Sequence, residues 1–175
     1  MGAFFKCNLK NAPILLAGRV GQVVNLSSLS GEVGVSSTTL ADWLSVLEAS
    51  YIVFKLKPYF SNLSKRLVKS PKIFFTEIGL ASYLLGIENE NQANRDPLRG
   101  NLFENLIVSE VIKKRLNQNK DPNSFYMRTA KGVEVDLIVR KEGNLHPFEI
   151  KTSMTPNMEA LIYLQNYWLI KTWCH

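Results

Sequence analysis

The hydrophobic positions in the first third of the chain have the spacing of short helices that are separated by turns. Asn11 followed by Pro13 is typical of a helix start, because Asn can cap free backbone N–H groups and Pro fits the first turn. Further Asn and Ser residues precede the next two apolar stretches, and Gly34 lies between those stretches. The pattern predicts helices over residues 11–21, 25–34 and 36–49.

After Ser50 the chain becomes rich in β-branched and aromatic residues, first over residues 51–56 and again over 72–75. Such runs favour strands, and the intervening segment, with a loop over 58–66, suits a hairpin or wing. A helical pair followed by a two-stranded wing is the outline of a winged helix-turn-helix. In that motif the second helix of the pair can enter the major groove of DNA.

The second half of the chain begins after a polar, Asn-rich stretch over 88–96, which predicts a linker. We therefore expect one domain over 1–87 and a second over 97–175. The second domain opens with helical spacing over 101–116, and the apolar residues of its expected buried face are Leu102, Phe103, Leu106, Ile107, Val111 and Ile112. Strand-like runs follow over 124–129, 133–140 and 145–151, and helical spacing returns over 157–169. The order predicts an α+β protein, a winged helix-turn-helix followed by an α-β-β-β-α core.

Composition narrows the class of protein. The chain has 175 residues, 46% of them hydrophobic, so it can bury a core. Its two cysteines, Cys7 and Cys174, cannot build a disulfide framework or a cysteine-rich zinc site, which excludes a small secreted scaffold. No apolar run approaches the roughly 20 residues that a membrane helix needs. We expect a cytoplasmic protein with no membrane contact.

The net charge of +6 is concentrated in one stretch. Between Tyr51 and Thr76 every charged residue is basic, namely Lys55, Lys57, Lys65, Arg66, Lys69 and Lys72. Together with Ser37 and Thr38 at the start of the candidate recognition helix, they form a candidate nucleic-acid surface. Asp42 and Glu48 on that helix argue against nucleic-acid binding, because their negative charges repel phosphates. The alternatives are a solvated hairpin whose lysines protect edge strands, or a module that packs against a neighbouring domain or subunit.

Candidate chemistry lies in the second half. Asp136 stands between Val135 and Leu137 on one expected strand, and Glu149 and Lys151 share a face of the next. A short turn between these strands would place Asp136 near Glu149. Closely spaced carboxylates need a neutralising cation, and Mg²⁺, which prefers oxygen ligands, could supply it and activate an attacking water.

An acid from the preceding helix, Glu104 or alternatively Glu110, could complete the magnesium ligands, and Lys151 could orient the water. The alternative is a surface ion-pair ladder across a hairpin. For Glu134 and Glu110, solvent exposure or a local salt bridge is the preferred interpretation. His146 is interpreted as structural.

Several stretches of the chain resemble a C-terminal domain of unknown function found in bacterial and archaeal AAA-type ATP-binding proteins. They are Gly21-Gln22-Val23-Val24-Asn25, Leu44-x-x-Leu47-Glu48-Ala49-Ser50-Tyr51-Ile52, Lys65 to Lys72, Pro97 to Asn105, Glu134-Val135-Asp136 and Glu149-Ile150-Lys151.

The resemblance implies a winged helix followed by a fold similar to the restriction-endonuclease superfamily. Gly100-x-x-x-Glu104 resembles its helix motif, Asp136 the strand acid, and Glu149 with Lys151 the Glu-x-Lys pair. It also implies an ATPase module or subunit as partner, since no Gly-x-x-x-x-Gly-Lys-Ser/Thr occurs here. The family normally continues beyond the Glu-x-Lys strand, so we expect a missing final element and an apolar face that self-association could cover.

Three functions follow as hypotheses. The first is Mg²⁺-dependent hydrolysis of DNA phosphodiesters, with Glu104, Asp136 and Glu149 as metal ligands and Lys151 as the fourth catalytic residue. The second is a non-catalytic DNA-binding module. The third is an interaction domain that docks an ATPase.

Overall fold

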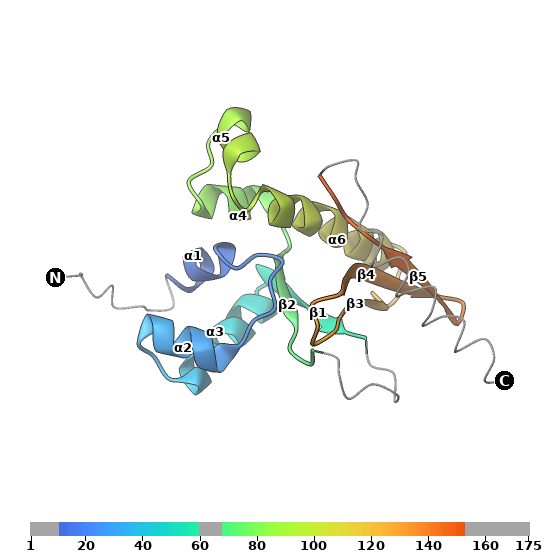
Figure 1. Ribbon diagram of the computed structural model, residues 1–175, viewed down its shortest axis with the longest axis horizontal. Helices are drawn as coiled ribbons and strands as arrows, with labels where there is room; N and C mark the ends of the chain where they lie inside the picture. Colours follow the sequence, from blue (N-terminus) through green and yellow to red (C-terminus); the bar gives the residue numbers. More distant parts are fainter. Residues whose placement is uncertain (1–10, 60–67, 153–175) are drawn as a thin grey trace.

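The computed structural model describes residues 11–59 and 68–152. Within those ranges the structure is α+β, with six helices and a five-stranded sheet of order β2-β1-β3-β4-β5 (Figure 1). The strands are β1 (Val53–Pro58), β2 (Lys72–Phe75), β3 (Ser124–Arg128), β4 (Glu134–Lys141) and β5 (Asn144–Phe148). The helices are α1 (Ala12–Ala17), α2 (Leu26–Val33), α3 (Ser37–Ala49), α4 (Ile78–Leu84), α5 (Glu90–Arg95) and α6 (Arg99–Asn117). The predicted fold class is confirmed.

The capping residues account for the bounds of α2 and α3. The side chain of Asn25 accepts hydrogen bonds from the backbone of Ser27 and Ser28, and Ser36 accepts one from Thr39. Gly34 ends α2 with a left-handed φ of 69°. The buried leucines of α2 and α3 then pack with α1 against Val53, Ile73 and Phe75 of the β1–β2 hairpin. The predicted helical pair and the pairing of the two following strands are thus confirmed.

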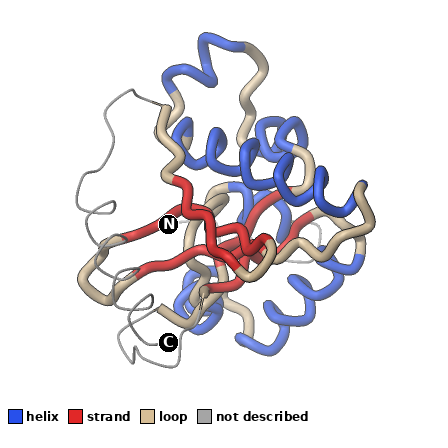
Figure 2. The backbone as a smooth tube through the Cα atoms, turned by 90° about the vertical axis from the view of Figure 1, so that its right-hand side faces the viewer, coloured by secondary structure: helices blue, strands red, loops and turns tan. Residues whose placement is uncertain are grey.

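The sheet is continuous across the two halves of the chain. β1 pairs antiparallel with β2 and parallel with β3, through Lys57 opposite Phe125 and Pro58 opposite Tyr126. The hairpin that the sequence predicts as a wing is therefore one end of the same sheet that carries β4 and β5. Figure 2 shows the strands running through the middle of the molecule with helices above and below them.

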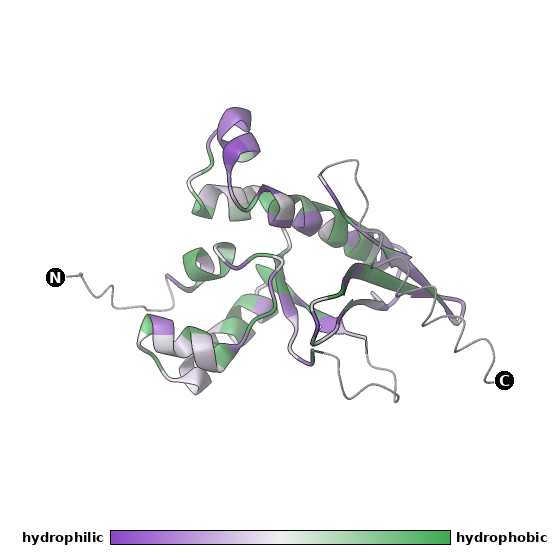
Figure 3. Ribbon diagram, in the orientation of Figure 1, coloured by the Kyte–Doolittle hydropathy of each residue, from purple (hydrophilic) through white to green (hydrophobic). Residues whose placement is uncertain are grey.

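The predicted linker over 88–96 contains the helix α5. Asn89 caps it by accepting a hydrogen bond from the backbone of Gln92, and Glu90 and Arg95 complement the helix dipole at its two ends. None of its residues is buried, and Figure 3 colours it hydrophilic. The segment predicted as a linker thus contains a short exposed helix, which its cap residues support without apolar periodicity.

Helix α6 packs on the sheet with a face that matches the predicted one only in part. Its buried residues are Leu102, Glu104, Asn105, Val108 and Ser109. Phe103 and Leu106, predicted to be buried, are 36% and 38% exposed. Leu102 is buried as predicted, and Val111 and Ile112 pack against the core. Among the buried residues that the prediction missed, Glu104 and Asn105 have polar partners inside the protein.

The side chain of Asn105 binds the backbone of β2. Its Oδ1 accepts a hydrogen bond from the Phe75 N–H at 2.7 Å, and its Nδ2 donates to the Phe75 carbonyl at 2.9 Å. Asn105 is fully buried. A single amide thus satisfies both outward-facing backbone groups of Phe75 at the edge of the sheet.

The predicted helix over 157–169 and the loop residues Lys65 and Arg66 lie outside the described residues. Along the described part of the chain, no helix combines the length and apolar character needed to span a bilayer.

The Asn105 contact makes a prediction about stability. Replacing Asn105 with Leu keeps the volume but leaves two buried backbone groups without partners, which should cost about 2–4 kcal/mol of unfolding free energy. Ser109→Ala on the same helix is the control, since its hydroxyl donates only to the Leu106 carbonyl of its own helix. Urea unfolding would measure both variants. Equal, small losses in the two would contradict a structural role for the amide.

Candidate functional site

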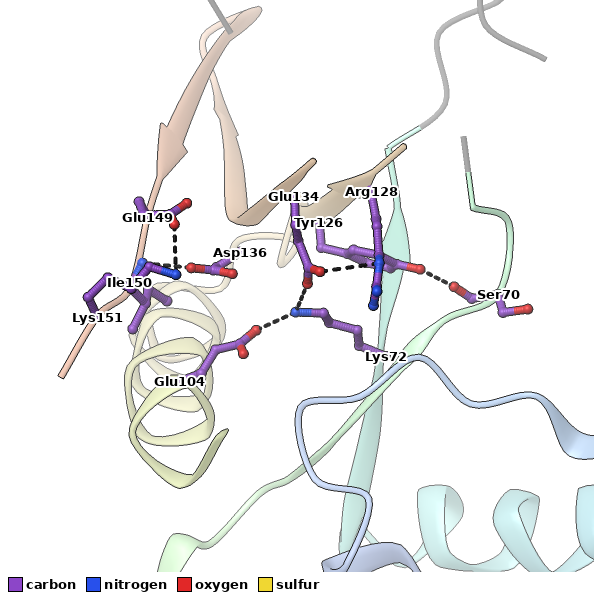
Figure 4. A network of polar contacts seen from close by, with 10 residues as sticks. All are labelled: Ser70, Lys72, Glu104, Tyr126, Arg128, Glu134, Asp136, Glu149, Ile150 and Lys151. Atoms are coloured by element: carbon purple, nitrogen blue, oxygen red, sulfur yellow. Dashed lines mark hydrogen bonds and ion pairs between the residues drawn. The ribbon is translucent and has the colours of Figure 1, made fainter. Parts of the chain in front are cut away.

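Three separate segments bring the predicted catalytic residues to one cavity of about 580 Å³. Glu104 comes from α6, Asp136 from β4, and Glu149 and Lys151 from the segment that follows β5 (Figure 4). Their convergence depends on α6 lying against the sheet and on the β4–β5 hairpin. Glu110, the alternative helical acid, is exposed and pairs with Lys113 on its own helix. Of the two helical acids, Glu104 is therefore the one at the cavity.

The β4–β5 register places Asp136 beside the Glu149–Lys151 segment. Leu137 pairs with Phe148, so the next position along the hairpin brings Asp136 opposite Glu149. Oδ2 of Asp136 accepts a hydrogen bond from the Ile150 N–H at 2.8 Å. Burial raises the pKa of Asp136, and the negative charge of Glu149 raises it further. The hydrogen bond from the Ile150 N–H acts in the opposite direction and lowers it.

Glu149 and Lys151 form an ion pair at the edge of this cavity. Lys151 Nζ lies 2.9 Å from Glu149 Oε1, and the Lys151 side chain is partly exposed. The hydrogen bond to Glu149 is the main cause that raises the pKa of Lys151. Lys151 is therefore an ammonium group at neutral pH, facing both the cavity and solvent.

A buried lysine links Glu104 to a fourth carboxylate in the same cavity, that of Glu134. Lys72 of β2 is 2% exposed, and its Nζ lies 2.7 Å from Glu104 Oε1 and also pairs with Glu134 Oε1. Burial lowers the pKa of Lys72, but Glu104 and Glu134 more than reverse that effect, so the net pKa lies above its usual value. Arg128 Nε approaches the other oxygen of Glu134 at 3.5 Å.

Burial has the opposite consequence for Glu104. Desolvation raises the pKa of Glu104 to about 7, although Lys72 opposes the shift. Asp136 and Glu134 add to the rise because their negative charges disfavour a third one nearby. The carboxyl group of Glu104 therefore changes protonation near neutral pH, which is unusual for glutamate and common at functional sites.

The candidate nucleic-acid residues are dispersed by the structure. Lys72 is buried in the cavity and cannot belong to an exposed basic surface, because its ammonium group is held by two acids. Lys55 pairs with Glu48 of α3 at 2.7 Å. The described residues of this set that stay exposed are Ser37, Thr38, Lys57 and Lys69.

Sequence reasoning missed several residues that line the cavity, among them Lys72, Arg128 and Gly21. Gly21 has a φ of +69°, its N–H donates to the Ile73 carbonyl, and a Cβ there would lie 3.4 Å from Glu104 Oε2. The left-handed φ favours glycine here, and a side chain at this position would lie in contact with the buried acid. The sequence did not indicate that Lys72 is buried, because lysine is rarely buried and a lysine at the start of an apolar strand is expected to face solvent.

The cavity offers the oxygen ligands that a hard divalent cation prefers. Glu104, Asp136 and Glu149 offer carboxylate oxygens, the ligands that Mg²⁺ prefers, and Mg²⁺ needs only one or two of them because it keeps several waters. Four carboxylates and three cationic side chains line the cavity, which leaves one negative charge in excess. Within residues 11–59 and 68–152, however, no three acidic, His or Cys side chains form a group that could enclose a metal ion.

Comparison with known proteins finds two adjacent regions of similarity. Residues 8–91 match a domain of unknown function (DUF8612), and residues 99–168 match a second domain of unknown function (DUF4143). No solved structure matches the chain.

Uncharacterized proteins of Mycobacterium bovis and Mycobacterium tuberculosis are each 32% identical over 163 residues, which cover 90% of this chain and 36% of theirs. An uncharacterized protein of Haemophilus influenzae is 28% identical over 138 residues, 76% of this chain and 31% of its own. The chain spans about a third of the length of these relatives. The protein thus carries two successive regions similar to domains of unknown function; the first ends within α5 and the second begins at the start of α6.

Proposed function

We propose that the chain is a Mg²⁺-dependent phosphodiesterase module that acts on DNA. The observation that carries the proposal is the convergence of Glu104, Asp136, Glu149 and Lys151 on one cavity, from three segments far apart in the sequence. A surface ion-pair ladder would not bury its acids, whereas Glu104 and Asp136 are each 8% exposed. Burying two carboxylates is costly, and a site that needs negative charge is a physical reason to keep them.

Each residue has a proposed role. Asp136 and Glu149 would hold the Mg²⁺ ion, with Glu104 as the third acid of the site. Bound Mg²⁺ would polarise the phosphodiester and lower the pKa of the attacking water. The ammonium group of Lys151, held by Glu149, would orient that water or stabilise the charge that develops on the phosphate.

Lys72 would hold the acids in place. Its contacts with Glu104 and Glu134 would offset the repulsion between neighbouring carboxylates when no Mg²⁺ is bound. The resemblance to AAA-associated domains and the greater length of the relatives support an ATPase module or subunit as the partner of this domain.

A second candidate function is a non-catalytic DNA-binding module. It is favoured by the absence, among the described residues, of a three-ligand metal group, and by the pairing of Glu104 with Lys72. In that case the buried acids are structural, and DNA affinity depends on exposed lysines such as Lys57 and Lys69.

The two functions differ in the effect of Asp136→Asn, which keeps an acceptor for the Ile150 N–H but removes the charge. We expect Mg²⁺-dependent nicking of supercoiled plasmid by the wild-type chain, and a rate lower by on the order of 100-fold or more in the variant. Glu110→Gln on the exposed side of α6 should retain full activity.

Gel retardation in the same samples completes the comparison. Unchanged DNA binding by Asp136→Asn, with no metal-dependent nicking by the wild type, would refute the hydrolytic function and support the binding module. Thermal unfolding of each variant verifies that it is folded.

Glu104 makes the stability of the protein depend on pH. A carboxyl whose pKa is about 7 in the folded protein and 4.5 in the unfolded chain binds its proton more tightly when folded. Its contribution to stability is therefore complete below about pH 4.5 and is lost as pH rises towards 7. Relative to Glu104→Gln, which stays neutral, the wild type should lose up to about 3 kcal/mol across that range. Urea unfolding of both proteins at several pH values measures the difference. A constant difference would show that Glu104 ionises normally.

A further inference from the structure

A second, larger cavity lies beside the candidate site. It measures about 1190 Å³ and runs between α6 and the β4–β5 hairpin; we call it the α6–β5 groove. Glu149 and Lys151 line both this groove and the cavity of the candidate site. A molecule lying along the groove would therefore pass directly by the groups proposed to carry the chemistry.

The lining of the groove includes apolar and aromatic side chains. Ile107 and Val111 contribute from α6, and Leu137 and Val139 from β4. Two phenylalanines stand at the sides, Phe103 of α6 and Phe148 of β5, and they are 36% and 49% exposed. Large aromatic side chains left open in a groove offer flat surfaces on which another ring can stack.

The groove is also strongly basic. Six Lys or Arg residues and two Glu residues line it, an excess of four positive charges. Both glutamates have lysine partners, Glu142 with Lys141 and Glu149 with Lys151. The charge favours a polyanion.

The volume, the positive charge and the exposed aromatic rings of the groove together favour one class of occupant. The volume exceeds the roughly 300–1,000 Å³ of ordinary small-molecule sites. A second copy of this chain, with its own net charge of +6, would bring like charge to a basic groove. Duplex DNA would use the cations but not the phenylalanines, since its bases are stacked inside. A single strand offers phosphates to lysines and base faces to aromatic rings at the same time.

We propose that the α6–β5 groove binds a single-stranded segment of DNA and leads it to the candidate site. This inference rests on the proposed function and names its substrate class: single strands, or the unpaired arm of a branched duplex. Phe103 and Phe148 stack with bases, and Lys114 and Lys141 contact phosphates.

The test measures the fluorescence anisotropy of a labelled oligothymidylate of about 16 nucleotides with the full chain. Phe148→Ala should weaken binding by on the order of 5- to 100-fold, the usual effect of removing one stacking ring. Tyr83→Ala is the matched control, because Tyr83 is 76% exposed on α4 and does not line the groove. Its affinity should equal that of the wild type.

The charge is tested separately through the salt dependence. The double variant Lys114→Ala/Lys141→Ala should bind more weakly and should lower the slope of log K against log salt by about 0.7 for each lysine that contacts a phosphate. Arg95→Ala on α5, outside the groove, removes one positive charge as the control and should leave the slope unchanged.

The outcomes separate this inference from the proposed function. Plasmid nicking together with no effect of Phe148→Ala, or with equal affinity for a duplex of the same length, would overturn the groove as a single-strand site and leave the hydrolytic function standing. Groove-dependent oligonucleotide binding without Mg²⁺-dependent nicking would support the groove and reject hydrolysis. A change in the elution volume of Phe148→Ala on gel filtration, with unchanged oligonucleotide affinity, would make this face an interface between copies and also overturn the proposal.

Discussion

The arrangement of the site depends on one buried ammonium group. Lys72 begins β2, near one edge of the sheet, and reaches Glu104 on α6 and Glu134 at the start of β4. It therefore connects the first half of the chain to both elements that supply acids to the cavity. Removing a partner from such a buried pair is usually far more costly than the pair's net contribution, because a charge is left without compensation. Lys72 thus links the relative position of the two halves to the integrity of the site.

The continuous sheet gives this link a rigid frame. The parallel pairing of β1 with β3 places the strand that follows α3 directly beside the strands of the second half. Tyr126 of β3 adds a further tie, since its hydroxyl donates to the carbonyl of Ser70 in the segment before β2, and its ring lies 5.5 Å from Lys72 Nζ. The helices and hairpin of the first half and the acid-lined core of the second half are therefore not independent parts of this protein. They share one sheet, and a movement of one half displaces side chains of the other.

Local patterns of the sequence were sufficient for most elements of the fold. Caps and apolar spacing predicted α2, α3 and α6, and the alternation around Asp136 with the short turn predicted its approach to the Glu149 segment. The β1–β3 pairing was not predictable in the same way, because parallel partners separated by about 70 residues leave no local trace.

The buried polar side chains of α6 were not predicted for a related reason. Glu104 and Asn105 are buried because of partners on β2, and those partners become neighbours only after the sheet forms. A hydrophobic count assigns such residues to the surface. Lys72 escaped prediction for the same reason. In the sequence it is one of six basic residues in a stretch without acids, and only the tertiary structure distinguishes it, with its two carboxylate partners, from the exposed Lys57 and Lys69.

The outer side of β2 has a consequence for assembly. The backbone of residues 21–24 bonds to the segment from Pro71 to Ile73, and the Asn105 amide occupies Phe75. An intruding strand would find these donors and acceptors already engaged, so fibrillar growth by hydrogen bonding from this margin is suppressed. The opposite margin, β5, includes Pro147, which has no N–H to offer an incoming chain. Both edge strands of the sheet thus resist pairing with a strand of another molecule. At β2 the outward backbone groups are already hydrogen-bonded, and at β5 the proline lacks a donor.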